Sequence, residues 1–206
     1  MTFNIDWKFI AGLEGADRLT GYVPLDAAGA VLGQSGVTVS TGFDVGQHSA
    51  IQIDDFFGKT DPALAALLKP YAGLKRTQAV AALAKTPLTI TQAQSTLIYT
   101  TVKTRAANQI AASYDAAVAA KADPKLVRFR ALAREAQTVI ASVAFQYGAD
   151  LKKAAPKFFR AAVAQDWATV ETELRNFGDG YRTRRGKEAD YLTPLVPKRT
   201  AKAKTP

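Results

Sequence analysis

The sequence predicts an α+β fold with a small β-containing N-terminal lobe, a larger helical lobe and a cleft between them. Two observations lead to this prediction. Residues 19–43 place β-branched residues in short alternating runs between glycines, which is typical of strands and turns. From residue 61 onward, apolar residues recur at helical spacing between capping residues and prolines. A chain of 206 residues, 48% of them hydrophobic, is long enough to bury a sizeable core.

The N-terminal part is predicted to contain one short helix and two strands. Residues 5–14 form an amphipathic segment that ends at Gly15, so we interpret them as a helix with a glycine C-cap. Residues 19–24 and 36–43 are expected to be strands. The connecting residues 25–35 are rich in Ala and Gly and predict a loop or hairpin turn.

The second strand alternates in a way that separates its two faces. Val37, Val39 and Thr41 alternate with Thr38 and Ser40. Because successive side chains of a strand point to opposite faces, we expect Thr38 on the face opposite the two valines.

The helical part is divided by capping residues, prolines and glycines. The predicted helices are residues 61–69, 76–84, 91–120, a helix opened by Asp123 and Pro124, 135–147, a helix opened by Pro156, 166–177 and 181–192. Residues 135–147 are apolar on most sides, which predicts a central buried helix capped by Gly148. We expect one domain over residues 1–193 and a mobile basic tail rich in Pro and Lys over residues 194–206.

Composition excludes several classes of site. The chain has no Cys and one His, which excludes disulfides, thiol catalysis and a multi-His metal centre. His48, in a polar turn, is interpreted as a surface or capping residue. Residues 1–60 carry a net charge of −4 and residues 61–206 carry +13. A basic body favours anionic polymers, although Arg184 and Arg185 are more readily explained by ion pairs with Glu188 and other helix acids.

Two carboxylates stand in surroundings of opposite kinds. Glu14 follows an apolar segment, which favours the protonated form of an acid, and Asp44 lies in a polar, glycine-rich turn that favours the ionised form. Such a pair is the minimum equipment for hydrolysis of a glycosidic bond. The alternatives are an exposed helix-terminal acid for Glu14 and a turn-forming residue for Asp44.

Three blocks of the N-terminal part resemble the lysozyme domain of pesticin-like proteins, within the phage-type lysozyme superfamily. They are residues 9–15, 19–24 and 35–47. Residues 139–148 are similar to the buried central helix of these lysozymes, and residues 181–188 to their C-terminal helix with two arginines.

The resemblance covers roughly residues 7–192 and implies a lysozyme-like fold and a peptidoglycan hydrolase. It implies a muramidase that cleaves the bond between N-acetylmuramic acid and N-acetylglucosamine with inversion and without a metal or cofactor. Glu14 matches the proton donor, and Thr38 and Asp44 match the pair that holds the attacking water. We expect a substrate pocket lined by Tyr22, Ser40, Thr41 and Gln47, with Tyr22 either stacking on a sugar or filling the core.

The expected partners are peptidoglycan glycan strands and, as a candidate, an immunity protein or inhibitor of a monomeric enzyme. No apolar run reaches transmembrane length, and the N-terminus does not have the pattern of a secretory signal peptide. We therefore expect synthesis in the cytoplasm and action on periplasmic peptidoglycan after delivery by a holin or a secretion system. The runner-up is a non-catalytic wall-binding or structural module. A nucleic-acid binder is disfavoured, because the aromatic residues lie in apolar stretches and are not interleaved with Lys and Arg.

Overall fold

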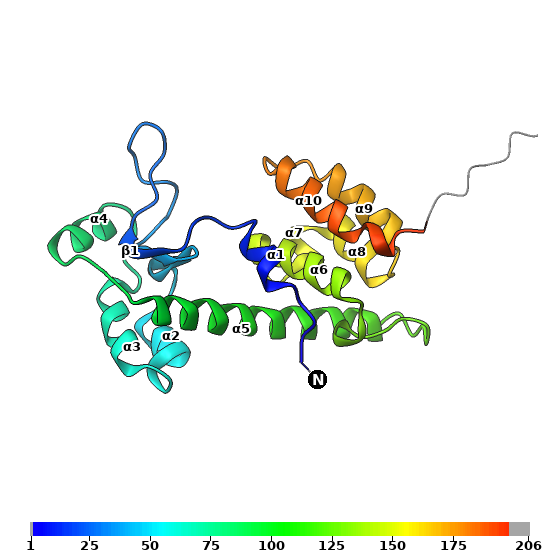
Figure 1. Ribbon diagram of the computed structural model, residues 1–206, viewed down its shortest axis with the longest axis horizontal. Coiled ribbons are helices and arrows are strands. Elements are labelled where there is room, and N and C mark those ends of the chain that lie inside the picture. Colours follow the sequence, from blue (N-terminus) through cyan, green and yellow to red (C-terminus); the bar gives the residue numbers. More distant parts are fainter. Residues whose placement is uncertain (1, 198–206) are drawn as a thin grey trace, which may run out of the picture. The chain divides into compact units, whose positions relative to one another are not determined.

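The computed structural model describes residues 2–197 and is mostly helical (60%), with one small antiparallel sheet (Figure 1). This confirms the predicted α+β class. The chain divides into two compact units. One unit is Glu14–Thr104, and the other combines Met1–Leu13 with Arg105–Pro206. The predicted tail, residues 194–206, begins within a 3-10 turn at Thr193–Leu195, and its residues 198–206 lie outside the described residues.

The unit Glu14–Thr104 contains the sheet. Its strands are β1 (Arg18–Tyr22), β2 (Thr38–Ser40) and β3 (Phe43–Asp44), paired antiparallel in the order β1-β2-β3. The single strand predicted over residues 36–43 is therefore wrong, because the chain reverses between β2 and β3. The reversal uses left-handed backbone at Ser40 (φ 58°) and Gly42 (φ 92°), and glycine adopts this conformation at low cost.

Helices pack against one face of this sheet and complete its core. They are α2 (Ala50–Ile53), a π turn (Asp54–Gly58), α3 (Pro62–Leu68), α4 (Arg76–Lys85) and the first part of α5 (Gln92–Ala119). Short 3-10 turns lie at Val45–Gln47 and Lys69–Tyr71. Val39 and Phe43 of the sheet, and Val37 just before β2, are buried in one cluster with side chains from these helices, so this unit has its own hydrophobic core. The α2 helix was not predicted, although Ser49 and Gln52 form a capping box at its start.

The other unit is built around a buried helix. Its helices are α1 (Trp7–Ala11), α6 (Arg134–Tyr147), α7 (Leu151–Ala154), α8 (Pro156–Val163), α9 (Trp167–Arg175) and α10 (Arg182–Leu192), with the second part of α5. Residues 136–144 of α6 are all buried, and Gly148 caps this helix, which confirms the predicted central helix. Figure 1 shows α9 and α10 side by side, and both α10 and α1 pack on α6.

Two predicted helix boundaries are wrong for local reasons. The helix predicted over residues 5–14 begins after its N-cap Asp6 and ends at Ala11, because the Leu13 amide donates to the Ile10 carbonyl (2.9 Å) and so tightens the last turn. The helix expected at Asp123 is only a turn. There the Asp123 carboxylate accepts from the Lys125 amide (2.9 Å), two residues on, which closes an Asx turn in place of a helix cap.

The two arginines of α10 lie in a buried ionic cluster. Arg184 Nε donates to the fully buried Glu188 (3.1 Å), and Arg185 pairs with both Glu188 and Asp179. Ser142 Oγ of α6 donates to the same Glu188 carboxylate (2.5 Å). These contacts confirm the ion-pair interpretation of Arg184 and Arg185 and connect α10 to α6.

Candidate functional site

Three of the predicted site residues form a row across the sheet. The register pairs Tyr22 of β1 with Thr38 of β2, and Thr38 with Asp44 of β3. Directly opposite residues of an antiparallel pair project from the same face, with Cβ atoms about 4.5–5.5 Å apart. Val39 pairs with Phe43 in the alternate position, and both of these side chains are in the core. The row therefore lies on the face of the sheet that turns away from the core.

The carboxylate of Asp44 is held by three N–H donors. The Gly36 amide lies 3.2 and 3.1 Å from its two oxygens, the Gly46 amide donates to Oδ1 (3.0 Å), and Gln47 Nε2 donates to Oδ2 (3.1 Å). An ionised carboxylate offers about four acceptor positions. The three donors fix the orientation of Asp44. Because the Gly36 N–H is shared between both oxygens, three N–H groups meet about four acceptor positions, and a further donor can bind only where this shared bond is weak.

The glycines around Asp44 are required by close packing. A Cβ atom on Gly46 would lie 2.2 Å from the Leu74 carbonyl oxygen and 2.7 Å from the Gly36 Cα. A Cβ atom on Gly36 would lie 2.6 Å from Gly46 Cα and 2.7 Å from Asp44 Oδ1. Both contacts are too short for any side chain, so only glycine lets these two amides approach the carboxylate.

Thr38 and Tyr22 differ in accessibility. Thr38 is only 3% exposed, and its hydroxyl donates to the Gly36 carbonyl at 3.4 Å, which leaves its lone pairs free to accept a hydrogen bond. Tyr22 is half-buried, and the guanidinium carbon of Arg18 lies 4.4 Å from the centre of its ring. One face of this ring is thus covered by a cation.

Glu14 lies in a bend three residues after the end of α1 and forms an ion pair with Lys103 of α5. Both side chains are largely buried, with 13% and 12% exposure. Lys103 contacts Oε1, while Oε2 is buried and has no hydrogen-bond partner among the described residues. Burial, together with the charge of Glu14, raises the pKa of Tyr99, one turn before Lys103, to about 12. The surroundings of Glu14 are therefore less apolar than the sequence suggests.

Lys103 was missed at the sequence level. It stands 89 residues from Glu14, and no local spacing connects the two. One signal was available, because Lys103 is the single charged residue between Lys85 and Arg105. A lone charge on an otherwise uncharged helical stretch indicates a specific partner, since burying an unpaired charge is costly.

The other predicted pocket residues take different places. Ser40 is buried, with its hydroxyl 2.6 Å from that of Ser95. Ser95 in turn donates to Asp17 (2.5 Å), so the Ser40 hydroxyl is occupied by protein partners. Gln47 is exposed and donates to Asp44 and to the Gln34 carbonyl, which makes it a support for the carboxylate. Thr41 is partly exposed at the turn between β2 and β3.

His48 packs beside the site without joining it. Its ring stacks on Phe43, with 4.9 Å between ring centres. Burial lowers the pKa of His48, and the charge of Asp44 opposes this shift in part. The ring is therefore neutral at neutral pH and acts as a packing group.

Within residues 2–197, no three His, Cys, Asp or Glu side chains are grouped closely enough to hold a metal ion. Over the same residues, none of the helices combines the length and apolar character needed to cross a membrane.

Comparison with known families gives one match, over residues 4–168, to the family Pesticin, described as the bacterial toxin homologue of phage lysozyme, C-terminal part. The chain belongs to the pesticin family. The matched residues include Glu14, Thr38 and Asp44, whereas the block 181–188 lies outside them. Among curated proteins no match was found. Membership of the pesticin family confirms the resemblance seen in the sequence and indicates a glycoside hydrolase of the lysozyme type, acting on peptidoglycan.

Proposed function

We propose that this member of the pesticin family is a muramidase that cleaves between N-acetylmuramic acid and N-acetylglucosamine with inversion at the anomeric carbon. The observation that carries the proposal is the pairing of Thr38 with an Asp44 carboxylate held by three N–H donors. An inverting glycosidase needs an acid on one side of the bond and, on the other side, a base that holds a water.

The water-holding step follows from the hydrogen bonds of the row. Asp44 can accept from a further donor where it shares the Gly36 N–H, and the Thr38 hydroxyl donates to Gly36, so it too can accept. A water that donates one hydrogen to Asp44 and the other to Thr38 directs a lone pair away from both residues. As this lone pair attacks the anomeric carbon, Asp44 takes up the proton.

Glu14 is the proposed proton donor to the glycosidic oxygen. Lys103 donates to Oε1, so a protonated Glu14 carries its proton on Oε2, the oxygen without a protein partner among the described residues. Lys103 is then a positioning residue, because it selects the donating oxygen. We expect Lys103→Met to lower kcat and Lys103→Arg to keep most of it, because arginine retains an N–H donor for Oε1.

The test uses purified sacculi with products analysed by mass spectrometry, together with NMR of the first-formed sugar anomer. We expect Glu14→Gln to lose activity by about 10²–10⁴-fold, the usual contribution of a general acid. Asp44→Asn and Thr38→Ala should lower kcat more than they change KM, because both residues act on the transition state.

Asp26→Asn is the matched control, because the Asp26 carboxylate also accepts from loop amides, those of Ala28 and Ala30, and lies outside the row. It should retain wild-type activity. A folded Glu14→Gln variant that clears sacculi at the wild-type rate would refute the assignment of the acid. Early product with retained configuration would make a side chain the nucleophile. Binding to sacculi without any fragments would favour the alternative, a non-catalytic wall-binding module.

A further inference from the structure

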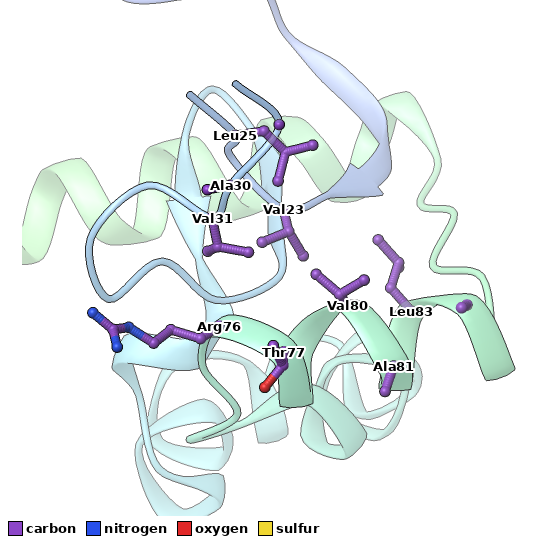
Figure 2. A pocket seen from close by; sticks show the side chains of 11 residues that line it. Val23, Leu25, Ala30, Val31, Arg76, Thr77, Val80, Ala81 and Leu83 are labelled. Atoms are coloured by element: carbon purple, nitrogen blue, oxygen red, sulfur yellow. The ribbon is translucent and has the colours of Figure 1, made fainter. Parts of the chain in front are cut away.

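An apolar groove lies in the unit Glu14–Thr104, between the loop that follows β1 and the helix α4. Its volume is about 980 Å³, which is within the usual range for ligand pockets. Figure 2 shows the two walls of the groove. Valine and leucine side chains of the loop face those of α4, and Arg76 lies at one end of the groove. The apolar side chains that line it include Val23, Leu25, Val31, Val80 and Leu83. The row of Tyr22, Thr38 and Asp44 does not line this groove.

The groove is open, and its apolar walls face water. Leu25 is 55% exposed and Val80 is 42% exposed, and both are among the most exposed large apolar side chains in the described part of the chain. Apolar side chains gathered at one exposed concave place mark a binding site more often than single exposed ones do.

The loop wall is held in its shape by its own hydrogen bonds. Leu25 and Val31 form a β-bridge, and the Leu32 amide donates to the Pro24 carbonyl (2.9 Å). The Asp26 carboxylate accepts hydrogen bonds from two amides of the loop, those of Ala28 and Ala30, and these bonds hold it within the loop. The groove therefore exists before any ligand arrives, and binding does not require ordering of the loop.

The charge near the groove is positive. Arg76 Nε donates to the Gly33 carbonyl (2.9 Å), while its two terminal nitrogens have no hydrogen bond or ion pair within the described residues. Arg76 is the one charged residue among those that line the groove. The groove thus fits a ligand that has an apolar body and a negative group at the end where Arg76 lies.

We propose that the groove binds a single-chain amphiphile with a carboxylate head, the chemistry of a free fatty acid. The alkyl chain lies between the loop and α4, and the carboxylate pairs with the terminal nitrogens of Arg76. A peptide or a sugar fits poorly, because its many polar groups would find few partners on these walls.

Titration of the full chain with dodecanoate, below its micelle concentration, tests the proposal by calorimetry and by NMR of the Val and Leu methyl groups. We expect saturable binding that tightens about two- to fourfold for each added methylene, since burial of a CH₂ contributes about 0.8 kcal/mol at most. Dodecanol and dodecyltrimethylammonium should bind at least fivefold more weakly than dodecanoate.

Three variants locate the site. Val80→Glu places a charge in the groove and should abolish binding, whereas Val127→Glu is its matched control, since Val127 is equally exposed (40%) and lies outside the groove. Arg76→Gln should weaken dodecanoate about five- to tenfold without changing the affinity for dodecanol, and Arg76→Lys should restore most of it.

Several results would overturn the proposal. These are no saturable binding by the wild-type chain, equal affinities for dodecanoate and dodecanol, or equal losses in Val80→Glu and Val127→Glu. Sedimentation that reveals a dimer lost only in Val80→Glu would show that a second copy covers the groove. None of these outcomes depends on cleavage of peptidoglycan, so the proposed muramidase activity is tested separately.

Discussion

Removing Glu188 tests whether the buried ionic cluster holds α10 on α6. Glu188 is fully buried and is shared by Arg184, Arg185 and Ser142, while Arg185 itself is only 2% exposed. In Glu188→Ala, two arginines lose a carboxylate that water cannot easily replace. Asp179 remains as a partner for Arg185 (2.9 Å) and limits the loss.

Breaking a buried pair by removing one partner costs about 3–5 kcal/mol. For a chain of this length, 1 kcal/mol shifts Tm by about 2–4 °C, so we expect Tm to fall by roughly 6–20 °C. Thermal melts followed by far-UV circular dichroism measure the shift. Glu171→Ala is the matched control, because Glu171 and Arg175 form an ion pair at the same i,i+4 spacing (2.8 Å) with Arg175 45% exposed. An exposed pair contributes about 0–1 kcal/mol, so this variant should stay within about 4 °C of the wild type.

Equal shifts for Glu188→Ala and Glu171→Ala would refute the reasoning, since they would mean that burial of the cluster adds nothing to its stability. Glu188→Gln is the milder change. It keeps one carbonyl acceptor for Ser142, but it loses the charge and replaces the oxygen that accepts from Arg185 with an NH₂ group, so its Tm should fall below that of the wild type and stay above that of Glu188→Ala.

Three further predictions concern the site and its support. Gly46→Ala forces the Leu74 carbonyl and the Asp44 turn apart, so sacculus cleavage should drop about a hundredfold; Gly180→Ala, whose Cβ would meet nothing within 4 Å, should leave the rate unchanged. A hydrogen bond from the Phe9 amide, helped by Tyr191 and Arg134, lowers the pKa of Asp6. Since the folded-state pKa lies below the unfolded one, this stabilisation is present above about pH 4 and is lost as the solution is acidified further; Asp6→Asn should therefore flatten the dependence of Tm on pH between about 5 and 2, and an unchanged slope would contradict it. Prior treatment with a chelator should leave the cleavage of sacculi unchanged, because no three potential metal ligands are grouped among the described residues. Activity that is lost after this treatment and restored by a divalent ion would overturn the mechanism.

Much of the fold could be predicted because its signals are local. Asp61 caps α3 through its own side chain, Pro156 opens α8, and Gly148 with φ 89° ends α6, so each boundary depends on residues next to it in the chain. The burial of α6 also followed from its composition, because apolar residues on most sides of a helix leave no face for water. The family was recognised from N-terminal blocks of the same local kind.

Predictions failed where two local choices had similar cost. Residues 36–43 alternate like one strand, yet the chain reverses at Gly42. Asp123 satisfies its carboxylate two residues on, in an Asx turn, although its sequence is equally suited to a helix cap. Nothing in the neighbouring residues decides between such alternatives, because tertiary packing selects one of them.

The fold class, the family and the three residues proposed for the reaction, Glu14, Thr38 and Asp44, could be predicted from the sequence alone. The pairing of Thr38 with Asp44 across a hairpin, and the room that Gly36 and Gly46 leave for two amides on the Asp44 carboxylate, became visible only in the folded chain. Folding also placed Lys103 on Glu14 and formed the groove from the loop after β1 and α4. The physical reason is that periodicity and capping report interactions within a few residues. A contact across 89 residues is fixed by the packing of whole elements, and it leaves no spacing in the sequence.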